Sequence, residues 1–265
     1  MTATTVRKRP EFKTLLLLVM TAFLVSACST ANSNMSESAQ LIADPYEKTN
    51  RRIFKFNTAV DKAVLRPISK VYQTIIPKPI RKGVTNILAN LKAPFIFAND
   101  LLQGKPKRAG QTFKGFVVNS TVGIGGIFKV SDKMGIKTHD EDFGQTLAEW
   151  GVGDGNFIML PFLGPSTPRD TVGAAVEFFA EPVNLILEDN NLSWVVWTRL
   201  GIGIVDARAR NGDLIDSLYT ESDPYIMTRT GWIQARRAAL RDGAPAPIDP
   251  DAEDPFDFDD EDYDE

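Results

Sequence analysis

Cysteine and histidine are the residue types in this chain best suited to covalent or metal chemistry, and each occurs once, as Cys28 and His139. A disulfide framework, a zinc cluster, a thiol nucleophile and a histidine-rich metal centre are therefore excluded. A Ser-His-Asp triad would have to use His139. Asp140, Glu141 and Asp142 follow it, which predicts a solvated polar loop. We expect no catalytic residue, no metal site, no cofactor and no enzymatic activity.

Two segments resemble the motifs of catalytic or nucleotide sites but lack their full pattern. The Gly-x-Gly-Gly at 123–126 lacks the Gly-x-Gly-x-x-Gly spacing and the Gly-Lys-Ser/Thr of a Walker loop, and no clear strand precedes it. Ser166 lacks the Gly-x-Ser-x-Gly context of a nucleophile elbow. The first is expected to be a sharp apolar turn or a close helix contact. Ser166 is expected in a turn or at a helix N-cap.

Cys28 stands directly after a segment with the composition of an export signal. Basic residues between positions 7 and 13 precede an apolar run over 15–25, well short of the ~20 residues that a spanning helix needs. Val25-Ser26-Ala27-Cys28 resembles the bacterial lipobox, whose cysteine is acylated after cleavage. Ser29 then favours sorting to the outer membrane. The alternative, an ordinary secretory signal, would leave a free cysteine in an oxidising compartment.

Charge and composition divide the rest of the chain. Residues 28–43 form a polar tether and 44–241 a body with helical patterning, while 242–265 contain 12 acidic residues and no Lys or Arg, which predicts a disordered tail. Within the body, 48–114 hold 15 basic residues against two acidic ones. A block of like charge this large marks an interaction surface.

Apolar residues at helical spacing predict a mainly α body. Helices are expected over 46–65, 68–76, 80–92, 109–117, 171–179 and 192–205 and after Asp223, with Pro67 and Pro94 ending or kinking two of them. Residues 131–135 are expected in a polar turn, and 143–170, dense in Gly and Pro, in an ordered loop without regular elements. The basic amphipathic helices fit either a globular core or a membrane interface, and an acylated Cys28 favours the interface.

Several motifs over residues 44–237 resemble those of the MlaA family of outer-membrane lipoproteins, also called VacJ. They are Asp44-Pro45-Tyr46-Glu47-Lys48-Thr49-Asn50-Arg51, Phe56-Asn57, Leu101-Leu102-Gln103-Gly104, Asn119-Ser120-Thr121-Val122-Gly123-Ile124-Gly125-Gly126, Phe143-Gly144-Gln145-Thr146-Leu147, Trp150-Gly151-Val152-Gly153, Leu160-Pro161-Phe162-Leu163-Gly164-Pro165-Ser166, Arg169-Asp170 and Asp223-Pro224-Tyr225.

The resemblance implies a ring-shaped bundle of amphipathic helices embedded in the periplasmic leaflet of the outer membrane, with Gly/Pro-rich ordered loops. It implies that phospholipids leave the outer leaflet through a central amphipathic channel and pass to the periplasmic carrier MlaC, with energy from an ATP-driven inner-membrane complex. The implied partners are phospholipids, the bilayer, MlaC and trimeric porins, and no nucleic acid. Two alternatives stay open, a porin-associated structural lipoprotein without transport activity and a lipid hydrolase.

The Gly-rich turn is the segment that we expect to move. Gly123, Ile124, Gly125, Gly126, Ile127 and Phe128 are interpreted as a hairpin that gates the channel. The chain departs from the family pattern directly after it, because Lys129-Val130-Ser131 stands where an acidic residue followed by Val-Ala is common. The departure leaves the expected fold unchanged.

Overall fold

The structure is a computed structural model that describes residues 44–245. The predicted signal peptide (1–27), Cys28, the tether through residue 43 and residues 246–265 of the tail lie outside the described range. Helices dominate, as predicted. In chain order the elements are α3 (Glu47–Val60), the π-helical turn η1 (Asp61–Leu65), α4 (Arg66–Ile75), α5 (Lys78–Leu102), α6 (Pro106–Thr121), α7 (Val130–Lys133), α8 (Phe143–Glu149), β1 (Ile158–Leu160), β2 (Gly164–Ser166), α9 (Pro168–Ala180), α10 (Pro182–Asp189), α11 (Ser193–Arg210), α12 (Gly212–Leu218) and α13 (Pro224–Leu240).

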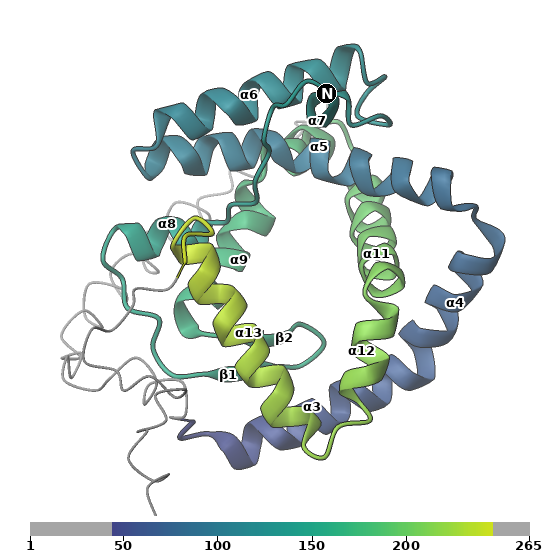
Figure 1. Ribbon diagram of the computed structural model, residues 1–265, viewed down its shortest axis with the longest axis vertical. Helices are drawn as coiled ribbons and strands as arrows, with labels where there is room; N and C mark the ends of the chain where they lie inside the picture. Colours follow the sequence, from purple (N-terminus) through teal and green to yellow (C-terminus); the bar gives the residue numbers. More distant parts are fainter. Residues whose placement is uncertain (1–43, 246–265) are drawn as a thin grey trace, which may run out of the picture.

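The helices form a ring around a central region that no ribbon crosses (Figure 1). α3, α4 and α5 make three successive sides, and α6 doubles back along the outside of α5. α11 and α12 lie on the inner side of α4, and α9 and α13 lie across the ring from them. The ring closes where α12 and α13 return to α3. This shape agrees with the one that the family resemblance implied.

The closure is made of ion pairs and amide contacts between distant parts of the sequence. Arg208 pairs with Asp61 and Asp216, each at 2.7 Å, and Arg51 pairs with Asp223 at 2.7 Å. The Tyr225 hydroxyl donates to Asp44. We call this group of contacts the closure seam; its members are Asp44, Arg51, Asp61, Arg208, Asp216, Asp223 and Tyr225.

A small hydrophobic core lies beside this seam. Phe157, Met159 and Tyr225 are buried together, and Phe54 and Trp232 pack against them. The antiparallel pair β1–β2, with Ile158 opposite Ser166 and Leu160 opposite Gly164, reaches this core from the loop region. Its position is set by Asn50, whose amide accepts from the Met159 N–H at 2.9 Å and donates to the Phe157 carbonyl at 3.2 Å.

The two prolines predicted to disrupt helices are both accommodated, and the interruption predicted at Pro94 is wrong. Before Pro67, Arg66 donates its N–H to the Asp61 carbonyl, so the chain passes through one π-helical turn and continues as α4. Pro94 lies inside a continuous α5. A helix-interior proline costs ~3 kcal/mol. Phe95 and Ile96 directly after it are almost fully buried, and their packing offsets this cost.

Regular structure also forms where the density of glycine and proline predicted none. Asp142 caps α8 by accepting from the Gln145 N–H at 2.8 Å. A Cβ at Gly173 would lie 2.4 Å from the backbone nitrogen of Gly144, so glycine lets α8 and α9 cross in near contact. The expectation of a loop without regular elements over 143–170 was wrong, because Gly144, read as a helix breaker, serves here as a packing position.

Two smaller departures have local causes. The predicted polar turn at 131–135 starts as the short helix α7, because Asn119 accepts from the Ser131 N–H at 2.9 Å. The helix predicted over 192–205 continues to Arg210 as α11, where Arg210 pairs with Asp206 one turn earlier.

Burial is inverted with respect to a water-soluble domain. Among the described residues, buried polar and charged side chains outnumber buried hydrophobic ones, and many large apolar side chains are exposed. Water-soluble proteins bury most of their aliphatic residues and leave Asp, Glu, Lys and Arg outside. No helix within residues 44–245 has both the length and the apolar character needed to cross a bilayer.

Candidate functional site

A cleft of about 530 Å³ opens where α5 meets α6 and α11. Lys129, at the end of the Gly-rich turn, and residues 138–140 complete its walls. In Figure 1 this is the part of the ring where α11 approaches α5. The volume falls within the ~300–1,000 Å³ that is usual for small-molecule sites. We call it the α5–α11 cleft.

The cleft has both apolar and polar walls. Its aliphatic and aromatic lining comes from Leu88, Ala93 and Ile96 of α5 and Phe116 of α6. Its polar lining includes three threonines and a larger set of carboxamide and ionisable groups, namely Asn86, Asn90, Asn119, Lys92, Lys129, His139, Asp140, Asp206 and Arg210. Both the polar and the apolar part of an amphipathic molecule would find matching surface here.

Asn90 lines the cleft, is deeply buried and lacks a full set of hydrogen bonds. Its side chain is 7% exposed, and its Nδ2 donates to the Ser120 hydroxyl at 2.9 Å. Its Oδ1 has no partner within the described residues. A buried polar atom without a partner costs ~1–3 kcal/mol, so such atoms are rare unless something binds them.

Lys92 lies at one wall between two carboxylates. Its Nζ is 3.0 Å from Asp140 and 3.4 Å from Glu177. Burial opposes the charged form of Lys92, but the two carboxylates outweigh it and raise the pKa of this ammonium group. Burial raises the pKa of Glu177, and Lys92 offsets that effect only in part. Lys92 therefore stays protonated and is engaged by its neighbours.

Lys129 and Arg210 are more open to solvent, and each pairs with one carboxylate among the described residues. Lys129 pairs with Asp132 at 3.2 Å, and Arg210 pairs with Asp206 at 3.0 Å. Asp132 is half exposed, so that pair is weak. Asp206 is buried and also accepts from Tyr72 at 3.1 Å and Thr85 at 2.7 Å. Asp206 would therefore keep two hydrogen bonds if Arg210 turned to a ligand.

The Gly-rich turn between α6 and α7 packs against Asn86 and Asn90 of α5, two residues that line the cleft. Asn86 of α5 donates to the Ile127 carbonyl at 2.9 Å, and a Cβ at Gly126 would lie 2.6 Å from Cβ of Asn90. Gly125 and Gly126 have φ angles of 66° and 94°, which side-chain-bearing residues rarely adopt. The turn thus docks on α5 through glycine, while Ile124 and Phe128 are exposed.

A buried polar network adjoins the cleft through His139 and Thr112, which line it. The His139 Nε2 lies 2.8 Å from Asp100, which also accepts from Thr112 at 2.8 Å. Glu141 is 1% exposed and accepts from Arg108 at 2.6 Å and Gln103 at 3.0 Å. The prediction of a solvated loop at 139–142 was wrong for His139, which binds the Asp100 carboxylate of α5, and for Glu141, which Arg108 and Gln103 draw inward.

Asp100, His139 and Glu141 also place one potential metal-ligand atom each within 4.8 Å of one another. Arg108 already approaches both carboxylates, at 2.6 Å from Glu141 and 3.7 Å from Asp100. A metal ion would have to compete with this fixed positive charge. The donor set therefore fits an ion-pair network that ties α5, α6 and the 139–141 segment together.

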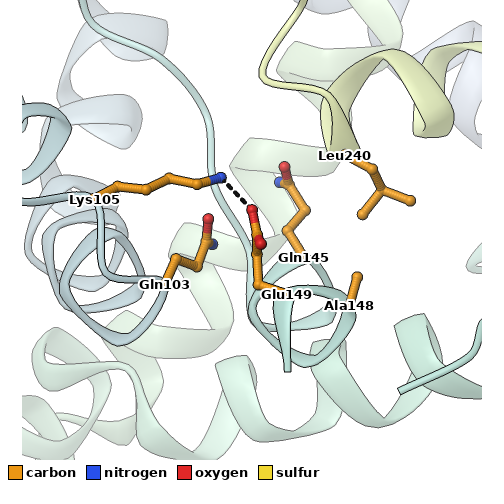
Figure 2. Close-up of a pocket in the computed structure, with 6 residues that line it drawn as sticks. All are labelled: Gln103, Lys105, Gln145, Ala148, Glu149 and Leu240. Atoms are coloured by element: carbon orange, nitrogen blue, oxygen red, sulfur yellow. Dashed lines mark ion pairs between the residues drawn. The ribbon is translucent and has the colours of Figure 1, made fainter. Parts of the chain in front are cut away.

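A second hollow of about 210 Å³ lies between the α5–α6 turn, α8 and the end of α13 (Figure 2). Lys105 points across it to Glu149 at 2.8 Å and also binds Asp242 at 2.9 Å. Burial opposes the charge on Lys105, but Glu149 and Asp242 raise the pKa of this lysine. Asp242 also pairs with Arg108 at 2.6 Å, so the first residue of the acidic tail is fixed to the body.

Exposed apolar side chains occur on many elements around the ring. Trp194 and Trp197 of α11 are 65% and 61% exposed, and Phe162 and Leu163 at the β1–β2 turn are 72% and 76% exposed. Tryptophan is enriched at the interfaces of membranes, where an amphipathic ring is favoured. Together with the polar interior, this pattern fits a lipid environment around the ring.

Sequence reasoning located some of this site and missed the rest. The predicted hairpin, Gly123, Ile124, Gly125, Gly126, Ile127 and Phe128, contacts Asn86 and Asn90 of the cleft wall, and its gating role stays a prediction. Cys28 lies outside the described residues. Ser166 bonds to Thr171 at 3.0 Å, while the adjacent Thr167 is the actual N-cap of α9. Asn90, Lys92 and Arg210 were missed. The polar Asn90 within the apolar run 87–91 was the one available signal.

The fold and the cleft define a class of protein, a helical ring that buries polar side chains and exposes many large apolar ones. The model of the MlaA lipoprotein family matches residues 42–239. This chain belongs to that family.

Relatives and a solved structure agree with this assignment. The chain is 33% identical over 234 residues to the "Intermembrane phospholipid transport system lipoprotein MlaA" of Haemophilus influenzae, covering 87% of this chain and 92% of that protein. It is 33% identical over 226 residues to the protein of the same name from Escherichia coli K12, covering 82% and 84%. A structure described as "Structural basis for maintenance of bacterial outer membrane lipid asymmetry" matches with a TM-score of 0.66 at 31% identity, over 75% of this chain and 98% of that one.

Proposed function

We propose that this protein is an outer-membrane lipoprotein that removes phospholipids from the outer leaflet and passes them towards the periplasm. The observation that carries the proposal is the inverted burial in this helical ring, in which polar and charged side chains are buried and many large apolar side chains are exposed. The names of the relatives, which refer to intermembrane phospholipid transport, support it. We propose that it acts without covalent chemistry, as a transport protein rather than an enzyme.

The physical problem in such transport is the headgroup. A charged phosphate and its neighbours cannot cross an apolar layer without a large desolvation cost. Amide and charged side chains inside a ring replace the lost water, while the acyl chains stay in contact with lipid or apolar walls. Helices suit this ring because they satisfy their backbone groups internally at membrane depth.

The Gly-rich turn at 123–128 is proposed to gate the passage. It contacts α5 through Gly126 and through the Asn86–Ile127 hydrogen bond, and these are few enough to break and reform. The exposed Ile124 and Phe128 would remain in an apolar environment in either position. Bulky residues at Gly125 and Gly126 should change outer-leaflet phospholipid levels at normal protein abundance, and unchanged lipid asymmetry would refute the gate.

Acylation of Cys28 is proposed to deliver the body to the periplasmic leaflet of the outer membrane. The exposed apolar side chains would then bind the bilayer themselves. Cys28→Ala should therefore shift the protein out of the outer-membrane fraction, as measured by fractionation, while its helical circular dichroism spectrum stays unchanged. A variant that still fractionates with the outer membrane would contradict this assignment.

The proposed route ends at the periplasmic carrier MlaC, and trimeric porins are proposed partners in the outer membrane. Transport is tested by incubating phospholipid vesicles that contain the purified lipoprotein with lipid-free carrier. Lipid gained by the carrier supports transport, whereas no gain would favour a porin-associated structural role. Release of free fatty acid would favour a lipid hydrolase instead.

The corresponding test in cells is deletion of the protein and measurement of outer-leaflet phospholipid with a surface-acting phospholipase. We expect more accessible phospholipid in the deletion strain and restoration by the wild-type chain. An unchanged outer leaflet in the deletion strain would contradict the proposed function.

A further inference from the structure

We propose that the α5–α11 cleft is a binding site for the phosphate ester of a phospholipid headgroup, with Asn90 at its base and Lys129 and Arg210 as phosphate contacts. The inference rests on the proposed function, because it specifies where the transported lipid is held. It concerns side chains that the chain brings together from α5, α11 and the end of the Gly-rich turn.

The first support is the unsatisfied amide of Asn90. The residue is 7% exposed and lines the cleft, yet one of its two side-chain polar atoms has no partner among residues 44–245. The partner of the other atom is the Ser120 hydroxyl, which can donate or accept. The amide can therefore present either its oxygen or its NH₂ group to the cleft, and the NH₂ group suits a phosphate oxygen.

The second support is the balance of charge around the cavity. Lys92, Lys129 and Arg210 face it, together with His139, Asp140 and Asp206. Lys92 is held by Asp140 and Glu177, and Asp206 is held by Tyr72, Thr85 and Arg210. Lys129 has a solvated partner in Asp132 and Arg210 is half exposed. These two cations can turn to an anion at little loss, and Arg in particular suits bidentate phosphate binding.

The third support is the apolar wall, which distinguishes a lipid from a free phosphate. Leu88, Ile96 and Phe116 line the same cavity as the polar groups. A small hydrated anion gains nothing from these side chains, whereas the glycerol and the first methylenes of a phospholipid would cover them. The shared chemistry is a phosphate ester, and the apolar lining favours a lipid as its source.

Lys129→Glu is the variant that tests this site, and Lys133→Glu is its matched control. Both lysines belong to the same short segment and both changes reverse one charge, but Lys133 is exposed and does not line the cleft. The full-length lipoprotein is purified in maltoside micelles and titrated with dioleoylphosphatidylethanolamine, with bound lipid counted by native mass spectrometry. We expect Lys129→Glu to bind about tenfold more weakly, and Lys133→Glu to bind as the wild type does.

Asn90→Asp provides a second, independent variant of nearly identical shape. The added negative charge should repel phosphate and weaken binding about tenfold. Its thermal unfolding is measured in parallel, so that a loss of binding counts only in a folded protein. If Asn90→Asp unfolds early, Asn90→Ser, which keeps a polar group without the charge, replaces it and should weaken binding less than Lys129→Glu does.

Two competitors separate the possible sources of the anion. Dioleoylglycerol has the same chains without phosphate and should not displace the bound lipid, and inorganic phosphate should displace it only weakly. Equal binding by the Lys129→Glu and Lys133→Glu variants would overturn the inference, as would inorganic phosphate that competes as well as the lipid does.

Outer-leaflet phospholipid is measured in deletion strains that are complemented with the wild type or with Lys129→Glu. This measurement distinguishes a failure of the headgroup site from a failure of the proposed function. If the wild-type chain fails to restore asymmetry, the proposed function fails. If the wild type and Lys129→Glu both restore asymmetry and bind lipid equally, the proposed function stands and the headgroup site is refuted.

Discussion

The closure seam and the α5–α11 cleft both bring charged and amide side chains of distant helices together, but they use them differently. At the seam, Arg208 is almost fully buried and forms bonds to both Asp61 and Asp216. At the cleft, Asn90 has an unpartnered oxygen and Arg210 is half exposed. The polar groups of the seam are hydrogen-bonded within the protein, whereas some of those at the cleft can still bind a ligand. The difference separates a structural contact from a surface that can accept a ligand.

Loss of Arg208 should show the strongest effect on folding. Asp61 would remain buried without its cation, and breaking a buried ion pair from one side costs ~3–5 kcal/mol. We therefore expect Arg208→Leu to lower the thermal unfolding midpoint strongly in maltoside micelles, as followed by circular dichroism. Arg52→Leu on the exposed side of α3 is the control and should change the midpoint little.

Arg208→Leu also tests whether the closure seam contributes only to stability and the α5–α11 cleft to lipid binding. At a temperature where Arg208→Leu remains folded, its affinity for phospholipid should equal that of the wild type. A variant that keeps its stability but loses lipid binding would show that the seam takes part in the site.

Gly126→Ala should have an intermediate effect, and Gly125→Ala is its matched control. Both glycines have positive φ, which costs a side-chain-bearing residue ~1–2 kcal/mol. An added Cβ meets nothing within 4 Å at Gly125, but lies 2.6 Å from Cβ of Asn90 at Gly126. We expect Gly126→Ala to be the more destabilising, by ~1–3 kcal/mol relative to the wild type in denaturant unfolding. Equal effects would mean that the turn does not rest on Asn90 in solution.

The sequence could predict helices but not the contacts that select among them. Apolar spacing located most helices and the mainly α class, and the family motifs implied the ring. Pro94 and Gly144 were misread, because a helix breaker is tolerated where tertiary packing offsets its cost, and such packing cannot be seen in the local sequence. His139 and Glu141 were placed in solvent because their partners, Asp100 and Arg108, lie in the helices α5 and α6.

The cleft was missed for the same reason. Lys129 and Arg210 lie far apart in the sequence, and each alone resembles a solvated charge. Their relation depends on how α11 approaches α5, which follows from the closure of the whole ring. An Asn within an apolar helical run was the only local sign, and it does not reveal which atom remains without a partner.

Two adjacent carboxyl groups next to the polar network should show opposite, small dependences on pH. Burial raises the pKa of Glu141, and Gln103 and Arg108 offset it only in part. The folded protein then binds more protons than the unfolded chain between the two pKa values, so the free energy of unfolding falls as pH rises through that window. Burial also opposes ionisation of Asp142, but Arg236 outweighs it and lowers the pKa. Its stabilisation is present above the unfolded pKa and is lost as pH falls through the folded one.

Glu141→Gln should therefore lessen the fall in unfolding free energy as pH rises above ~4.3, the pKa of Glu in the unfolded chain. Asp142→Asn should lessen the loss of unfolding free energy as pH falls below ~3.9, the pKa of Asp in the unfolded chain. Glu177 beside the cleft has a raised pKa as well, so a residual fall should persist in Glu141→Gln. Unfolding midpoints measured from pH 3 to pH 7 would test both signs. Parallel curves for Glu141→Gln and the wild type would mean that Glu141 is ionised in the fold as readily as in the unfolded chain. The partners of Glu141 would then compensate the burial of its charge as fully as the partners of the closure seam do.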